Sequence, residues 1–165
     1  MIAQEFYRQR PDRVAALVLC DTAAKIGTDE SWDQRIAQVE RGGVESIADS
    51  VLERWFTAEF RASRVAELAG IRAMLTRTPR QGYLAACGAL KRDDLRPYAG
   101  QIEAPTLCLV GDEDGSTPVA LVKETAALIA GSRFEIIEGA GHLPNVEKPK
   151  MVAGLIAEHA KRVAP

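Results

Sequence analysis

Three short apolar runs alternate with longer amphipathic segments along the chain. The runs are Val14 to Cys20, Thr106 to Val110 and Phe134 to Ile137. Because apolar residues follow one another without alternation, this pattern is typical of strands that are covered on both faces of a parallel sheet. The run at 14–20 is expected to be an interior strand, and its edge would invite pairing with another chain if no neighbour covered it.

The segments after the second and third runs repeat their apolar residues at helical spacing. They are predicted to form helices over about 119–130 and 145–163, and the first ten residues are predicted to form another helix that ends at Pro11. Alternation of strand and helix implies right-handed parallel crossovers. The sequence therefore predicts an α/β fold with about three parallel strands and flanking helices.

The middle third of the chain, residues 28–92, carries no strand-like run and breaks the alternation. Its helical segments are predicted at about 31–41, 44–56, 63–78 and 80–91. A helical insertion between two strands usually lies over the carboxyl ends of a parallel sheet, where such sheets hold ligands. We therefore expect an α/β core made of residues 1–27 and 93–165, and a helical lid or cap made of residues 28–92.

Composition excludes several classes of function. The 165 residues carry a net charge of −2 with scattered cations, which is not the footprint of a nucleic-acid-binding protein. No run reaches the roughly 18 apolar residues of a membrane span, and the first residues do not form a secretory signal. Three cysteines without metal-ligand spacing favour reduced thiols in a cytoplasmic protein. A nucleophilic role for Cys20, at the end of a strand, is the weaker alternative.

An acid and a histidine provide the candidate chemistry. Asp114 and His142 stand 28 positions apart, each on a loop that follows a predicted strand. A carboxylate can orient an imidazole that then acts as a general base. Asp112 competes with Asp114, because an Asp in that turn can instead bond the backbone. His159, on the last helix, is interpreted as a helix-flank residue.

A nucleophile for this pair is missing from the sequence. A serine nucleophile of this kind sits on a Gly-x-Ser-x-Gly turn between a strand and a helix, and the sequence contains no such motif. None of the six serines lies on a predicted strand-to-helix elbow. Ser116 is the serine closest in sequence to Asp114 and is interpreted as a turn residue.

Several stretches resemble one family of enzymes. Val110-Gly111-Asp112-Glu113-Asp114 is similar to the acid loop of the α/β-hydrolases, and Gly139-Ala140-Gly141-His142 is similar to their histidine loop. The chain most closely resembles the 3-oxoadipate enol-lactonases. Four further stretches support this resemblance: residues 18–27, Arg54-Trp55-Phe56-Thr57, residues 77–83 and Asp94-Leu95-Arg96.

The resemblance implies a function and a mechanism. The chain would be the C-terminal part of an α/β-hydrolase, beginning just after the turn that carries the serine. Asp114 would hold His142, which would activate the serine for attack on a lactone or ester, without a metal or an organic cofactor. This chain alone is expected to be inactive, because the serine and the oxyanion donors would precede Met1.

The lid contributes candidate substrate-binding residues. Trp32, Trp55 and Phe56 line a substrate pocket in one interpretation and pack lid helices together in the other. An arginine is expected to face the carboxylate of the lactone, and the sequence does not choose among the candidates, which are Arg35, Arg54 and Arg77.

Two other functions stay open at this stage. The chain would be an inert interaction or folding unit, or it would belong to another serine-type hydrolase such as an esterase or a cofactor-free haloperoxidase. The expected macromolecular partner is an N-terminal fragment or a second copy that covers the edge of strand 14–20, and neither nucleic acid nor membrane is expected to bind.

Overall fold

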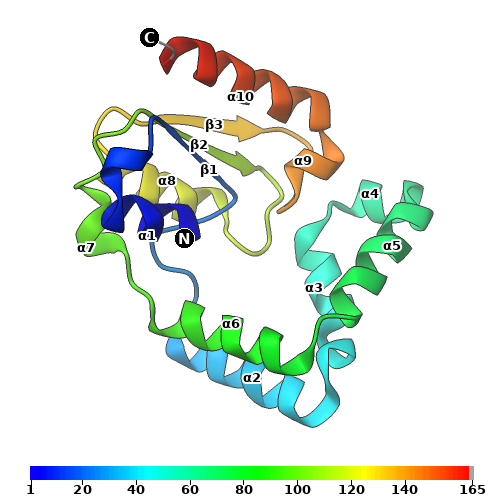
Figure 1. Ribbon diagram of the computed structural model, residues 1–165. Coiled ribbons are helices and arrows are strands. Elements are labelled where there is room, and N and C mark those ends of the chain that lie inside the picture. The colour runs from blue at the N-terminus through cyan, green and yellow to red at the C-terminus, as the bar shows by residue number, and fades with distance from the viewer. Residues whose placement is uncertain (164–165) are drawn as a thin grey trace.

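A computed structural model describes residues 1–163 and places three parallel strands in one sheet. The strands are β1 (Leu17–Cys20), β2 (Thr106–Gly111) and β3 (Arg133–Ile137), in the order β1-β2-β3 (Figure 1). The predicted α/β class with three parallel strands is confirmed. Within the described residues β1 pairs only with β2, so it lies at the edge of the sheet rather than in its interior. It begins three residues later than predicted, after a 3-10 turn at Pro11–Arg13.

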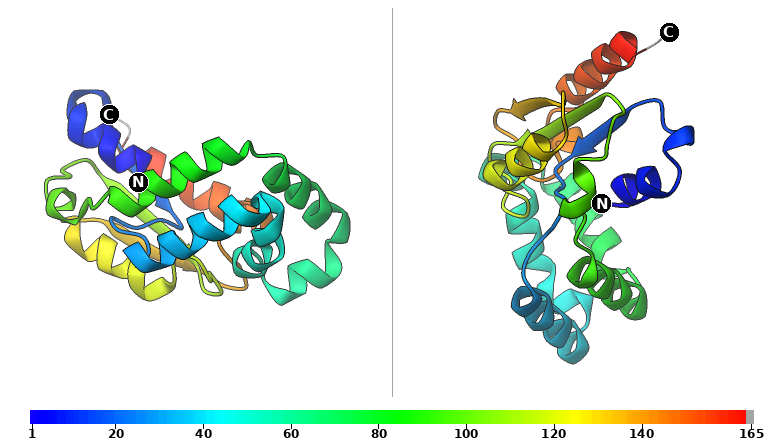
Figure 2. Two further views of the ribbon diagram at one scale, coloured as in Figure 1. Left: turned by 90° about the horizontal axis from the view of Figure 1, so that it is seen from below. Right: turned by 90° about the vertical axis from the view of Figure 1, so that its left-hand side faces the viewer.

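Helices cover both faces of the sheet. One face is covered by α1 (Ile2–Gln9), the short α7 (Arg96–Ala99) and α8 (Val119–Leu128), and α10 (Pro149–Val163) covers the other (Figures 1 and 2). Successive strand residues point to opposite faces, so a strand between two helical layers is apolar at successive positions. This explains the unbroken apolar runs of β1 and β2, whereas β3, at the other edge of the sheet, contains Glu135 and leaves Ile136 47% exposed.

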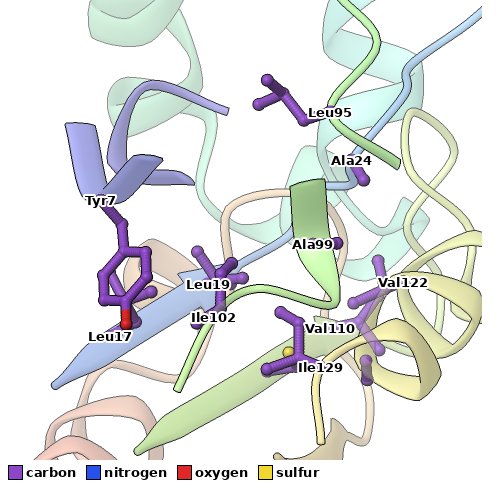
Figure 3. Packing of buried hydrophobic residues seen from close by; sticks show 12 residues of the cluster. Tyr7, Leu17, Leu19, Ala24, Leu95, Ala99, Ile102, Val110, Val122 and Ile129 are labelled. Carbon is purple, nitrogen blue, oxygen red and sulfur yellow. The ribbon is translucent and has the colours of Figure 1, made fainter. Parts of the chain in front are cut away.

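The core between the sheet and α8 is made of alternate strand residues. Leu17 and Leu19 of β1 and Val110 of β2 pack with Val122 and Ile129 (Figure 3). The intervening residues turn to α10, where the buried members of the cluster are Leu107, Leu109, Ile137, Ala140 and Val152. Every residue of β2 is buried. The central strand is thereby fixed, and so is the starting point of the loop that follows it.

Helices α2–α6 form a separate layer, which we call the lid. They are α2 (Asp29–Gly42), α3 (Ala48–Trp55), α4 (Ala58–Ser63), α5 (Val65–Thr76) and α6 (Arg80–Arg92). Helices α2 and α6 lie side by side, and α3 approaches the loops at the carboxyl ends of the strands (Figures 1 and 2). The lid has its own buried cluster, which includes Val39, Ile47 and Val51.

Two predicted helices are divided in the structure, and one helix was not predicted. The segment 44–56 is a 3-10 turn at Val44–Ile47 followed by α3. The predicted segment 63–78 corresponds to α5 alone, and α4 is an additional helix before it, which begins where the Thr57 side chain accepts a hydrogen bond from Phe60 N. The last segment divides into α9 (Pro144–Glu147) and α10. None of the helices in residues 1–163 has the length and apolar character needed to cross a membrane.

His159 is not on the flank of the last helix, as the sequence suggested. It is buried, with Nε2 3.3 Å from the carbonyl oxygen of Pro105. The helix turns this residue toward the sheet, next to the segment that leads into β2. Its role is therefore to fasten α10 to the sheet.

Candidate active site

Two loops at the carboxyl ends of neighbouring strands bring an acid and a histidine together. The acid loop, residues 112–118, follows β2, and the histidine loop, residues 138–143, follows β3. Nδ1 of His142 lies 2.9 Å from Oδ2 of Asp114. The pair that the sequence singled out therefore shares one hydrogen bond across the two loops.

The carboxylate of Asp114 is held by its own loop. The backbone amides of Ser116 and Thr117 donate to Oδ1 at 2.7 and 2.9 Å, and Thr117 Oγ1 donates to Oδ2 at 2.7 Å. Burial opposes the charge of this carboxyl, but the bonds from His142 and Thr117 outweigh burial and hold the pKa of Asp114 below its usual value. Asp114 is therefore a fixed anion that directs the imidazole.

Glycine allows the two loops to approach each other. A Cβ on Gly111 would lie 2.2 Å from the carbonyl oxygen of Gly141 and 2.3 Å from that of Ala140. Across the same contact, Glu113 N donates to Ala140 O at 2.9 Å and Ala140 N donates to Asp112 Oδ1 at 3.2 Å. Asp112 thus binds the backbone of the histidine loop and leaves the imidazole to Asp114.

The lid forms hydrogen bonds with both loops. At the end of α3, Trp55 O accepts from His142 N at 2.9 Å and Arg54 O accepts from Gly115 N at 3.1 Å. The Trp55 ring stacks on the His142 ring, with centroids 6.2 Å apart and planes inclined by 30°. Backbone and ring contacts from one helix end therefore position the histidine against the lid.

A cavity of about 340 Å³ lies between the lid and these loops. His142, Thr117 and Ser116 from the two loops line it, together with Trp32 and Trp55 of the lid. The lining residues are Ile26, Gly27, Ser31, Trp32, Arg35, Val51, Arg54, Trp55, Tyr83, Ala86, Cys87, Leu90, Ser116, Thr117 and His142. They form a largely apolar pocket with the imidazole in its lining, which is the usual character of a small-molecule site.

The other lid candidates divide between the cavity and the packing of the lid. Phe56 does not line this cavity: it is buried and stacks on Phe60, with ring centroids 4.6 Å apart. Arg35 and Arg54 line the cavity, whereas the exposed Arg77 does not. Arg35 Nη1 lies within hydrogen-bond distance of Tyr83 Oη, at 3.2 Å. Two guanidinium groups are thus available to a ligand in the cavity.

A second buried carboxyl, Asp21, completes the polar cluster and was missed by the sequence analysis. One ligand atom from each of Asp21, Asp114 and His142 lies within 4.8 Å of the other two. A cation is a poor fit there, because Asp114 already accepts three hydrogen bonds from its loop and a fourth contact from His142. The signal for Asp21 in the sequence was an acid that directly follows an apolar run. Asp112 follows its own apolar run in a similar way, after one glycine.

Cys20 does not have the character of a nucleophile. Its Sγ donates to Asp21 Oδ2 at 2.9 Å, and burial followed by this hydrogen bond raises the pKa of the thiol well above its usual range. A thiol that stays protonated is a poor nucleophile. Burial also raises the pKa of Cys108 to about 11.

The arrangement supports general base chemistry. With Nδ1 of His142 committed to Asp114, the ring presents Nε2 as the nitrogen that can accept a proton, and the side chain is 22% exposed on the cavity side. The neighbouring anion stabilises the imidazolium that forms when the proton is accepted. Within residues 1–163, no serine hydroxyl is bonded to this imidazole.

Comparisons with known proteins agree on one family. The model of the "Alpha/beta hydrolase family" matches residues 1–155. 3-oxoadipate enol-lactonase 2 of Acinetobacter baylyi is 33% identical over 140 residues, which are 85% of this chain and 52% of that protein. The pimeloyl-[acyl-carrier protein] methyl ester esterase of Chromobacterium violaceum is 28% identical over 174 residues, covering 99% of this chain and 67% of that protein. The chain spans about half the length of the curated enol-lactonases it matches.

Solved structures of the same kind superpose closely. The enol-lactonase from Burkholderia xenovorans LB400 aligns with a TM-score of 0.92 and 33% identity, over 96% of this chain and 60% of that chain. A thermophilic esterase from Thermogutta terrifontis aligns with a TM-score of 0.89 and 32% identity, over 99% of this chain and 62% of that chain.

Proposed function

Because this chain belongs to the alpha/beta hydrolase family, we propose that it provides the acid, the base and the lid of an enzyme that hydrolyses a carboxylic ester or lactone. The observation that carries the proposal is the 2.9 Å contact between Asp114 and His142, whose imidazole lines the cavity. Asp114 and His142 are the proposed catalytic residues. Trp32 and Trp55 are the proposed walls of the substrate site.

The proposed reaction is an acyl transfer through a covalent intermediate. A serine hydroxyl attacks the carbonyl carbon, His142 Nε2 takes the hydroxyl proton, and Asp114 stabilises the resulting imidazolium. The C–O bond to the leaving oxygen breaks, and the imidazolium returns the proton to that oxygen. Water then attacks the acyl-enzyme by the same route and releases the acid. No step requires a metal or an organic cofactor.

We assign the attacking serine and the oxyanion donors to polypeptide outside these 165 residues. Ser116 and Ser31 reach the cavity, but Ser116 binds Asp114 through its amide and Ser31 caps α2 through contacts with Thr28. Neither hydroxyl contacts His142. On this proposal the chain alone does not turn over substrate.

The expected substrate is 3-oxoadipate enol-lactone, or a related small ester, in the cytoplasm. Similarity to two enol-lactonases of Acinetobacter baylyi over half of their length supports the lactone. The match to the methyl ester esterase of Chromobacterium violaceum keeps a simple ester as the second candidate. A panel that contains both substrate types separates the two.

The edge of β1 is the proposed docking place of the missing part. In the described chain β1 pairs on one side only, and Ile2 and Phe6 of α1 are exposed nearby. An unpaired parallel strand with apolar neighbours favours strand addition. We therefore expect either a serine-bearing segment or a second copy of this chain at that edge. Light scattering after size-exclusion chromatography checks this, and a stable monomer at micromolar concentration would contradict it.

Restoring the missing part tests the activity. The portion of the Acinetobacter baylyi enol-lactonase 2 that this chain does not cover is joined ahead of Met1, and hydrolysis of the enol-lactone and of a nitrophenyl ester is measured. We expect turnover that falls roughly 10³–10⁴-fold in His142→Ala. The matched control is Glu138→Gln, an exposed carboxyl of the same loop, which should change the rate by less than about twofold.

A folded fusion without turnover would contradict the proposal. Circular dichroism and a single unfolding transition establish that the fusion is folded. Such a result favours the alternative in which the chain is an inert folding or interaction unit. Hydrolysis that survives His142→Ala would also contradict it.

A further inference from the structure

Asp21 has an unusual backbone for its position. It directly follows β1 and adopts a φ of 47°, and it is the one non-glycine residue among 1–163 with a positive φ. Non-glycine residues enter this region at a cost, and Asp and Asn do so more easily than other residues. The strained turn directs a carboxyl inward that is only 6% exposed.

The carboxyl of Asp21 connects the ends of two strands. Its Oδ1 accepts from Gly111 N at 2.9 Å, and its Oδ2 accepts from Cys20 Sγ at 2.9 Å. Its backbone amide donates to Leu109 O at 2.9 Å. Because Gly111 is the last residue of β2, directly before the acid loop, Asp21 holds the place from which the loop departs toward Asp114.

Asp21 also faces the catalytic pair directly. One oxygen of Asp21, one of Asp114 and one nitrogen of His142 lie within 4.8 Å of one another, and Asp21 and Asp114 are both buried. We propose that Asp21 is a second positioning carboxyl of this site, which stabilises the charged form of His142 from the end of β1. The role in turnover rests on the proposed function, whereas the effect on the histidine does not.

The groups around Asp21 determine the pH at which its carboxyl becomes charged. Burial and, to a smaller extent, the charge of Asp114 raise the pKa of Asp21, whereas the bonds from Cys20 and Gly111 and the charge of His142 lower it, and the net result is a pKa of about 7. From α1, the amino group of Met1 donates to Thr22 Oγ1 at 3.0 Å, one residue along the chain. Asp21 is therefore expected to ionise near neutral pH, where it adds a second negative charge beside the imidazole.

Titration of His142 by NMR tests the inference on this chain as it is. The protein has two histidines, so the two imidazole C2–H signals are assigned with His142→Ala. Asp21→Asn is the decisive variant: asparagine keeps the acceptor for Gly111 N, tolerates positive φ and removes only the charge. At neutral pH we expect the C2–H signal of His142 in this variant to move from its parent position toward that of a neutral imidazole. The signal of the buried His159 should keep its position.

A matched control separates the effect of Asp21 from that of any nearby charge. Asp112→Asn removes an exposed carboxylate from the acid loop and keeps an acceptor for Ala140 N. Water and salt screen such a group, so we expect a much smaller movement of the His142 signal in this variant than in Asp21→Asn. Equal shifts in the two variants would overturn the assignment of Asp21.

A second measurement requires no substitution. In the unchanged chain, the Asp21 carboxyl carbon should titrate between about pH 6 and 8, and the His142 signal should show an inflection at the same pH. If the His142 signal in Asp21→Asn coincides with that of the parent, or if the His142 signal of the unchanged chain does not respond to the titration of Asp21, the inference is wrong. A reconstituted enzyme that turns over substrate while His142 is unshifted would keep the proposed function and refute only the role of Asp21.

Discussion

Glu147 fastens the histidine loop to the lid through Thr57. Its Oε1 accepts from Thr57 Oγ1 at 2.7 Å and from Thr57 N at 3.1 Å, and its Oε2 accepts from Gly141 N at 2.5 Å. Thr57 in turn caps α4, and the neighbouring Trp55 holds His142. One half-buried carboxylate therefore serves the start of a lid helix and the residue before the histidine.

Replacing Glu147 with glutamine should loosen this junction. Glutamine keeps one acceptor, but its amide nitrogen cannot accept from Gly141 N, which loses a charge-assisted bond of about 1.5–3 kcal/mol. Urea unfolding should show a loss of that size. Glu138→Gln, at an exposed position of the histidine loop, should change the free energy of unfolding by less than about 0.5 kcal/mol. Equal losses would show that Glu147 does not make this connection.

Gly111→Ala should separate the acid and histidine loops. The added Cβ meets two carbonyl oxygens at 2.2 and 2.3 Å, and backbone cannot give way as a flexible side chain can. We expect a loss of about 1–3 kcal/mol or more in the free energy of unfolding. The His142 signal should also move in the NMR spectrum, because the histidine loop must shift.

A second glycine provides the control for that substitution. A Cβ on Gly154, in α10, meets no atom within 4 Å. Gly154→Ala should therefore stabilise the chain by about 0.5–1 kcal/mol, since alanine favours the helix. If both variants lose stability equally, contact between the two loops is not the cause.

These contacts show what the sequence could and could not predict. The strands were recognisable because both faces of the sheet are covered, which makes their apolar runs continuous. Asp114 and His142 were recognisable because each follows such a run. The short helix α4 was not, because a single cap at Thr57 decides that a helix begins there.

Asp21 and Glu147 act through contacts between residues far apart in the sequence. Asp21 binds Gly111, 90 positions away, and Glu147 binds Thr57, also 90 positions away. No local pattern specifies such partners, so both residues appeared as ordinary acids in loops or helix ends. The choice between Asp112 and Asp114 likewise depended on which carboxylate reaches across to His142.

The two buried aspartates should give opposite pH dependences of stability. The pKa of Asp21 rises from its ordinary 3.8 to about 7 in the fold, so its contribution is fully present below pH 4 and is lost as the pH rises through 7. Asp21→Asn should therefore gain stability relative to the parent between pH 4 and 8. Each kcal/mol gained corresponds to a rise of about 2–4 °C in the Tm.

Asp114→Asn should change the pH dependence of stability in the opposite direction. The pKa of Asp114 is lowered in the fold, so its contribution is present above its ordinary pKa and is lost as the pH falls through the folded value. The variant should be less stable than the parent at pH 7, and the difference should shrink below pH 4. Thermal unfolding of both variants at several pH values checks the two signs, and parallel curves would contradict this account.

Arg35 and Arg54 should recognise a carboxylate on the substrate. Both line the cavity, and none of its lining residues is acidic. Neither guanidinium forms an ion pair within the described residues. A hydrogen bond to a charged group contributes about 1.5–3 kcal/mol, so Arg35→Gln in the reconstituted enzyme should raise the KM for a carboxylate-bearing lactone roughly tenfold or more. The kcat for a neutral ester should stay within about twofold. Arg77→Gln, outside the cavity, is the control, and an equal rise in KM there would show that the cavity arginines do not select the anion.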